Sequence, residues 1–311
     1  MAIDQSGQFL GIKRGIIVKR LGAISILLLA ASPVMAADMA VKARPMVAPV
    51  PYVNDILKAN NQISLDAVGT NIDYAESYPD HVQPGVFDQE KGWVPGLSVT
   101  GSWMGDLNGI HNLYAMGRGT WINGHTDYWA SNGLTNSDGA SVWDADFRLG
   151  KGFDIGTNSM LTPYIGAGGH WWSRNLVGPG GYHEDYSHGY AGAGLMFQVA
   201  PVSRLVLSVN GLVGSTFNSS MSTSNNGGAP INPYTYGLGN SVMYMAGISA
   251  DYAFTEHLHG NIGFDYMHFA YGQSARSPID ASLEPDSRTD YYTVRAGLGY
   301  SFYAGPVVAK Y

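Results

Sequence analysis

The sequence predicts an all-β protein, a closed antiparallel up-and-down transmembrane β-barrel of about ten strands, with eight as the alternative count. Three observations predict this fold: segments in which apolar and polar residues alternate, connections between them that are alternately short and long, and an export signal at the start of the chain. Successive side chains of a strand point to opposite faces, so each alternating segment has one apolar and one polar face. A membrane barrel turns the apolar faces toward lipid and the polar faces toward its lumen.

The start of the chain has the features of a secretory signal peptide. Basic residues, among them Lys19 and Arg20, precede an apolar run at residues 23–31, and a group of small residues ends at Ala36. This pattern predicts a signal peptide over residues 1–36. A membrane anchor is the alternative, but the run is shorter than the roughly 20 residues that a helical span requires. Residues 37–60 are rich in proline and are expected to form an extended periplasmic lead-in with no fold of its own.

Alternating segments then recur within residues 61–302, the predicted barrel. They cover residues 62–74, 93–103, 109–126, 143–149, 160–172, 186–199, 204–217, 241–254, 258–271 and 291–302. Most exceed the usual 5–6 residues of soluble strands and suit a tilted membrane span. A soluble sandwich also buries one face of each strand, so the length of the segments and the pattern of their connections decide against that alternative.

The connections between the segments are alternately short and long. Short ones near residues 106–109, 154–158, 200–203 and 254–257 carry turn-forming residues such as Asn-Gly and Pro. Longer polar loops are expected at about residues 77–90, 128–139, 175–184, 219–240 and 273–288. Outer-membrane barrels have short periplasmic turns and longer extracellular loops. Both ends of the barrel are therefore expected on the periplasmic side, with residues 303–311 as a C-terminal periplasmic tail.

The last segment shows the alternation most clearly. Tyr292, Val294, Leu298 and Phe302 lie on one face, and the residues between them are small or polar. Aromatic residues at both ends of an apolar face are typical of strands whose rings lie at the two membrane–water interfaces. The segment also resembles the C-terminal strand that outer-membrane barrels present to their insertion machinery. We therefore expect residues 292–302 to bind that machinery.

Composition narrows the class of protein further. The chain has no cysteine, so disulfides play no part in its stability. Its formal net charge is −7, and it becomes more acidic when the basic signal peptide is removed, which argues against nucleic acid as a partner. Glycine is abundant, with 41 residues, and several glycines fall on predicted lumen faces, where we expect them to leave room for water. These are Gly166, Gly168, Gly192, Gly194, Gly297 and Gly299.

Three short stretches resemble the small porin-family surface proteins of alphaproteobacteria. They are residues 37–45 (ADMAVKARP), residues 161–169 (LTPYIGAGG) in a mid-barrel strand, and residues 305–311 (GPVVAKY) beyond the last strand. The resemblance implies an outer-membrane barrel and specifies architecture more than activity. Typical members of that family have eight strands, so the ten segments of this chain are a departure.

Charged residues on the polar faces are the first candidates for function. Asp144, Asp146 and Arg148 follow one another on the polar face of one segment. The other predicted lumen-lining charges are Asp66, Arg118, Asp251, Asp265 and Arg295. Such residues form either a constriction that selects solutes by charge or a salt-bridged plug. The plug is favoured, because a barrel of eight to ten strands is nearly filled by its own side chains.

A second candidate group lies near the predicted loop at residues 175–184. His183, Asp185 and His188 are rim candidates, since His and carboxylates together suit an acid–base pair or a metal site. Exposed polar loops also contain such residues by chance, and we therefore predict no metal site and no cofactor.

Two enzymatic alternatives involve other residues. Ten strands are typical of the omptin surface proteases, and His125 with Asp127 is a candidate pair for such a site. Lipid A deacylation by a Ser–His pair is a known activity of other barrels, and His268 with Ser274 is the candidate there. Neither pair lies in a convincing local motif, so no catalytic residue is predicted.

The sequence therefore predicts a non-enzymatic outer-membrane protein with a structural or interaction role and limited passive diffusion of small solutes. The alternative is a rim-sited outer-membrane hydrolase, either an omptin-like protease or a lipid A-modifying enzyme. The expected partners are outer-membrane lipid and lipopolysaccharide and the barrel-insertion machinery. The solute, the extracellular ligand and the oligomeric state are left open.

Overall fold

The computed structural model describes residues 54–178, 181–227 and 231–303. The predicted signal peptide, most of the periplasmic lead-in and all but the first residue of the C-terminal tail lie outside the described residues. The described residues form one closed barrel.

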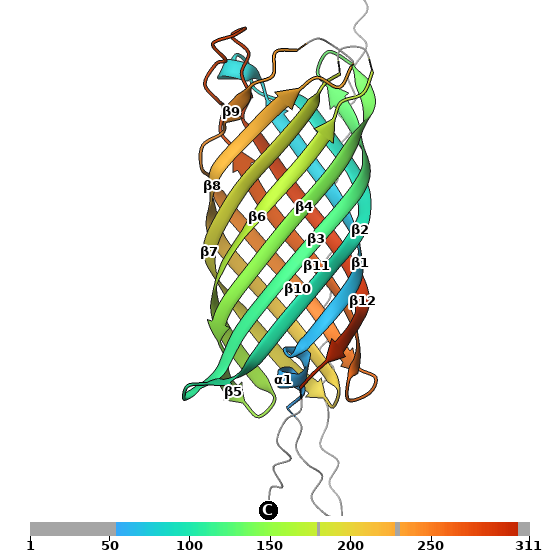
Figure 1. Cartoon of the computed structure of the whole chain (residues 1–311), viewed down its shortest axis with the longest axis vertical. Helices are drawn as coiled ribbons and strands as arrows, with labels where there is room; N and C mark the ends of the chain where they lie inside the picture. The colour runs from blue at the N-terminus through green and yellow to red at the C-terminus, as the bar shows by residue number, and fades with distance from the viewer. Residues whose placement is uncertain (1–53, 179–180, 228–230, 304–311) are drawn as a thin grey trace, which may run out of the picture. The chain divides into compact units, whose positions relative to one another are not determined.

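Within these residues ten long strands form the wall of the barrel (Figure 1). They are β1 (Gln62–Ser77), β2 (Val86–Leu107), β3 (Ile110–Ala130), β4 (Thr135–Lys151), β6 (Ser159–Asn175), β7 (His183–Val202), β8 (Leu205–Ser224), β10 (Val242–Ala253), β11 (Leu258–Tyr271) and β12 (Ser287–Ser301). Each pairs antiparallel with its neighbour in the chain, and β12 pairs with β1 to close the sheet. Two short strands, β5 (Phe153–Gly156) and β9 (Thr235–Gly237), extend single edges of this wall. The predicted fold class and the count of ten strands are confirmed.

The alternation in the sequence becomes an outer and an inner face. Leu65 of β1 lies opposite Leu298 of β12 and Val99 of β2, and all three side chains are about half exposed on the outside. The adjacent Asp66 and Ser98 are buried inside. A contiguous apolar exterior of this kind is unfavourable in water and favourable in the hydrocarbon core of a membrane.

Tryptophan marks the outer face at both ends of this apolar band. Six of the seven tryptophans have exposed side chains, and Trp121 stacks on Trp143 with ring centroids 5.8 Å apart. Trp171 and Trp172 are neighbours in β6, yet the first is exposed and the second is buried in the lumen. Amphipathic rings at these heights anchor a membrane protein at the two interfaces.

Most strands are longer than the sequence predicts, and the loops at the loop end are correspondingly shorter. The predicted loop at residues 128–139, for example, is reduced to residues 131–134, because β3 continues to Ala130 and β4 begins at Thr135. A membrane strand needs only about 9–11 residues, so the wall continues beyond the apolar band. There both faces are polar and the alternation disappears, while the backbone pairing persists.

The two ends of the barrel differ. The loop end carries the connections at residues 78–85, 131–134, 176–182, 225–241 and 272–286, of which the first contains a short 3-10 helix, η1 (Pro79–His81). The turn end carries the tight connections at residues 108–109, 152–158, 203–204 and 254–257.

A short helix, α1 (Asp55–Ala59), lies at the turn end just before β1. The side chain of Asn54 caps it by accepting hydrogen bonds from the backbone N–H groups of Ile56 (3.1 Å) and Leu57 (3.2 Å). Ile56 is buried against methionines and tyrosines that fill the lumen at the turn end. The end of the lead-in is therefore helical, and not extended as expected, because its apolar residues have a hydrophobic surface on which to fold.

Side chains pack the lumen in two hydrophobic clusters. The cluster at the loop end is built around Trp172, Tyr186 and Phe269, and the one at the turn end around Met104, Met160 and Tyr164. Arg118 and Arg295 line lumen cavities that reach residues of both clusters. In the described part of the chain, no helix is long and apolar enough to cross a membrane.

Placing a charge on the apolar outer face should destabilise the barrel. Ile262→Arg on β11, whose side chain is 63% exposed, should lower the free energy of unfolding by about 2–4 kcal/mol, because it places a guanidinium in lipid. The matched control is Asn123→Arg on the outer face of β3 toward the loop end, which should cost less than about 1 kcal/mol. Urea unfolding in liposomes, followed by tryptophan fluorescence, measures both. Equal losses would contradict the assignment of the apolar band.

Candidate functional site: the lumen and the loop-end cavity

The eight lumen candidates all have their side chains on the inner face of the barrel. Five of them line one lumen cavity: Arg118, Asp144, Asp146, Asp265 and Arg295. Arg148 and Asp251 line a second cavity nearer the turn end, and Asp66 is fully buried beside Ser64.

Polar contacts inside the lumen join the strands of the wall, and two of them, Arg118 with Asp265 and Arg148 with Asn210, join strands that are not neighbours in the sheet. The Asp265 carboxylate on β11 accepts hydrogen bonds from Arg295 Nε of β12 (2.8 Å) and Arg118 Nη1 of β3 (3.4 Å). Arg148 of β4 donates to Asp146 Oδ2 (2.9 Å) and to Asn210 Oδ1 of β8 (2.9 Å). Since each charge has a partner, the cost of removing it from water is offset.

Little open space remains beside these ion pairs. The two lumen cavities have volumes of about 80 and 100 Å³, which is enough for a few water molecules. The inner glycines do not provide a water path, contrary to expectation. A Cβ atom on Gly168 would meet the ring of Tyr190, and one on Gly194 would meet the ring of Tyr164. These glycines make room for tyrosines of neighbouring strands.

The rim candidates do not form one site. His183 and Asp185 of β7 lie on the outer face, with His183 Nε2 at 3.1 Å from Asp185 Oδ1. His188 is buried on the inner face, where its Nδ1 lies 2.6 Å from the Tyr271 hydroxyl and its ring stacks on His170. The separation follows from the pleat, because residues an odd number of positions apart point to opposite faces.

The two enzymatic pairs are also not assembled. His125 and Asp127 are exposed on the outer face of β3. His268 Nδ1 lies 2.8 Å from Asp290 Oδ1, whereas the Ser274 hydroxyl accepts a hydrogen bond from the Glu284 backbone N–H and donates one to the Ala275 carbonyl oxygen.

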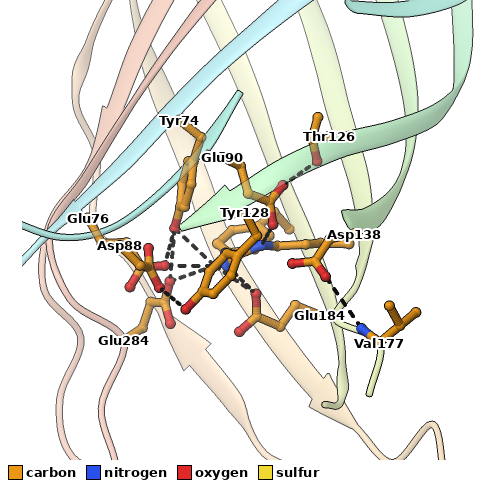
Figure 2. A network of polar contacts seen from close by, with 12 residues as sticks. Tyr74, Glu76, Asp88, Glu90, Thr126, Tyr128, Asp138, Val177, Glu184 and Glu284 are labelled. Atoms are coloured by element: carbon orange, nitrogen blue, oxygen red, sulfur yellow. Dashed lines mark hydrogen bonds and ion pairs between the residues drawn. The ribbon is translucent and has the colours of Figure 1, made fainter. Parts of the chain in front are cut away.

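The densest group of charges lies at the loop end, and the sequence analysis did not identify it. Six buried carboxyl groups gather there, labelled in Figure 2, and three of them pair with the guanidinium of Arg174 from β6; we call this group the acidic cluster. Its acidic members are Glu76, Asp88, Glu90, Asp138, Glu184 and Glu284.

Arg174 is the centre of the acidic cluster. Its Nη1 donates to Glu184 Oε2 (2.7 Å) and Glu76 Oε1 (3.4 Å), and its Nε donates to Glu90. Its guanidinium also lies 5.1 Å from the ring centroid of Tyr74 and 5.6 Å from that of Tyr128. This one cation joins β1, β2, β6 and β7 inside the barrel.

Glu284 reaches the acidic cluster from the loop between β11 and β12. Its Oε1 accepts a hydrogen bond from the Tyr186 hydroxyl (2.6 Å). The backbone of this loop is held by a hydrogen bond from Ser274 N to Glu284 O (2.9 Å) and one from Ser277 N to Ser282 O (2.7 Å). The loop therefore folds inward and places a carboxyl group in the mouth of the barrel.

A cavity of about 620 Å³ lies beside the acidic cluster. Carboxylates and Arg174 form one part of its lining, and Phe87, Leu134 and Leu283 contribute apolar surface. Its volume is within the range of small-molecule sites, which measure about 300–1,000 Å³. No group of three or more metal-ligating side chains with suitable geometry occurs among the described residues.

Removing the central cation should destabilise the loop end. Arg174→Met leaves the buried carboxylates uncompensated and should lower the free energy of unfolding by about 3–5 kcal/mol. Arg288→Met, which removes an exposed partner of Asp290 on the outer face, should cost less than about 1 kcal/mol. Urea titration in liposomes compares the two, and similar small losses would show that Arg174 is not the centre of the acidic cluster.

The docking of the loop at residues 272–286 should weaken as the pH rises. Burial, and next the Glu184 carboxylate, raise the pKa of the Glu284 carboxyl well above its ordinary value. Its contribution to docking is therefore complete below the unfolded pKa of about 4.3 and is lost as the pH rises through the raised folded pKa. Hydrogen exchange at the Ser274 and Ser277 amides, corrected for intrinsic rates, should show falling protection from pH 5 to pH 8. Glu284→Gln should flatten this dependence, and an unchanged slope in that variant would assign it to another group.

Comparisons with known proteins agree with the fold. No protein-family model and no curated protein matches the chain. Among solved structures, the outer membrane protease OmpT from Escherichia coli matches with a TM-score of 0.52 and 14% identity, over 78% of this chain and 95% of that one. The outer membrane protein OprG from Pseudomonas aeruginosa matches with a TM-score of 0.32 and 12% identity, over 79% of this chain and 99% of that one. At this identity the likeness to OmpT concerns the fold alone, and the chain has the fold of a small outer-membrane β-barrel protein.

Proposed function

We propose that the protein is a closed outer-membrane barrel with a structural and surface-interaction role, and that it does not catalyse a reaction. The observation that carries this proposal is the obstruction of the lumen. The ion pair of Arg118 with Asp265 crosses it, Arg295 of the neighbouring strand pairs with the same carboxylate, and the cavities beside these side chains hold only about 80 and 100 Å³.

The turn end is obstructed as well. Helix α1 packs its apolar side on the lower lumen cluster, and Asn60 Nδ2 donates a hydrogen bond to Gln198 Oε1 of β7 (2.6 Å). A solute would have to displace both this helix and the ion pairs. Passive diffusion through the barrel, the weaker part of the sequence-based expectation, is therefore not part of the proposal.

The membrane position follows from the same features. The apolar outer face supports insertion in the outer membrane, with the loop end outside the cell and lipopolysaccharide around the part of the wall nearest the loop end.

We also propose that residues 292–302 bind the insertion machinery. In the closed barrel the backbone N–H of Phe302 donates to the Asn61 carbonyl oxygen (3.0 Å). The three stretches that resemble small porin-family surface proteins of alphaproteobacteria support the same role.

The alternative of a rim-sited hydrolase has no support in the geometry. His183 and Asp185 face outward and His188 faces inward, so no substrate can contact all three side chains. The fold that the chain shares with a protease does not transfer the activity, because function depends on the site and not on the fold.

Single-channel recording tests the proposal. The refolded protein in a planar bilayer should give no steady conductance, because its lumen is filled. The triple variant Arg118→Ala, Asp265→Ala, Arg295→Ala should give measurable current steps, since it removes the Arg118–Asp265 contact across the lumen together with the second arginine that pairs with Asp265.

Arg288→Ala, on the outer face, is the matched control and should stay silent. Heat modifiability in gels confirms that each variant is folded. Steady ion-selective conductance of the unmodified protein would overturn the proposal and would establish a pore.

A further inference from the structure

The cavity at the loop end combines charge with unsatisfied hydrogen-bonding groups. Oδ1 of Asp88, Oδ2 of Asp138 and Nη2 of Arg174 are buried and have no hydrogen-bond partner among the described residues. The three side chains are at most 6% exposed, and all three line the cavity. A buried polar atom without a partner costs about 1–3 kcal/mol, so each is a position where a ligand atom would bind favourably.

The unsatisfied atoms specify the chemistry of the ligand. Two are carboxyl oxygens, which accept hydrogen bonds and carry negative charge above the pKa values that burial raises to about 6 for Asp88 and about 7 for Asp138; the third is a guanidinium nitrogen, which donates one. The cavity lining holds five carboxyl groups but only two arginines, Arg174 and Arg276, and a bound cation favours the ionised form of those carboxyl groups. The resulting field favours a cation. A quaternary ammonium has no N–H group for Asp88 and Asp138, whereas a primary ammonium has three.

The size of the cavity and its apolar side restrict the ligand further. A volume of about 620 Å³ far exceeds one metal ion, and the side chains of Phe87, Leu134 and Leu283 provide contacts for a hydrocarbon chain. Arg174 Nη2 can donate to a neutral oxygen of the ligand, such as a carbonyl or hydroxyl. A ligand carboxylate would meet the repulsion of the acidic cluster.

We propose that the loop-end cavity binds a primary ammonium group carried on an aliphatic chain. Its N–H groups donate hydrogen bonds to the carboxylates of Asp88 and Asp138. A free aliphatic diamine and the side chain of a lysine share this chemistry. The inference goes beyond the structural role proposed above, and a silent or a conducting barrel leaves it unaffected.

Calorimetric titration of the refolded full-length protein in detergent tests the inference. The probes are cadaverine, Nα-acetyl-lysine amide, tetramethylammonium and Mg²⁺, at constant ionic strength. We expect saturable binding of at least one primary amine, with tetramethylammonium and Mg²⁺ on the order of tenfold weaker or worse. Binding of the diamine alone would identify a free amine as the source, and binding of the lysine derivative would identify a peptide side chain.

Variants locate the binding. The double variant Asp88→Asn, Asp138→Asn should weaken amine binding on the order of tenfold or more. The matched control is Asp127→Asn, Asp185→Asn, which removes the same charge from exposed outer-face positions on β3 and β7 and should leave the affinity unchanged. The ring of Trp172 lies 5.9 Å from the Arg174 guanidinium, so tryptophan fluorescence is a second readout of binding that does not require a measurable heat of binding.

Three outcomes would overturn the inference. They are no saturable binding of either amine, equal affinity for Mg²⁺ or tetramethylammonium, and equal losses in the cavity variant and the outer-face control. Should the cavity variant fail to show heat modifiability, the single variant Asp138→Asn replaces it. An unchanged affinity in that folded variant would overturn the role of Asp138.

Discussion

The requirement that every backbone N–H and C=O group in lipid has a partner determines this structure. The pairing of β1 with β12, from Gln62 with Ser301 to Glu76 with Ser287, removes the two edges that an open sheet would expose. Closure also fixes which residues face each other across the lumen. The contact of Arg118 with Asp265, between β3 and β11, exists only because the sheet returns on itself.

The transmembrane part of the fold could be predicted from the sequence because lipid selects apolar residues at every second position. Leu65, Phe147 and Ile262 are each recognisable by that rule. Above the membrane the selection ends. The part of β2 near the loop end, with Asp88 and Glu90 inward and Gln89 outward, has no apolar face, so the alternation rule predicts a loop up to residue 90. The helix at the end of the lead-in could not be predicted from the sequence, because Ile56 packs against apolar side chains that are distant in the chain.

The candidate site illustrates the same limit. The alternation within each strand predicts the lumen charges, whereas the acidic cluster collects one or two residues from each of six separate segments, among them Glu76, Arg174 and Glu284. No local motif joins them. Only the register of neighbouring strands and the inward fold of the last long loop bring them together. Phase also separates residues that are close in sequence, as it does for Asp185 and His188.

The extension of the wall beyond the membrane affects how the outer part of this protein can change in evolution. In a barrel with long loops, insertions and substitutions at the surface are tolerated because the loop backbone has no fixed partners. Here most residues near the loop end belong to strands paired on both sides, and a one-residue insertion in β3 or β7 would reverse the phase of all residues beyond it. Variation that keeps the fold is therefore confined to outward-facing side chains and to a few short connections, of which residues 131–134 are an example.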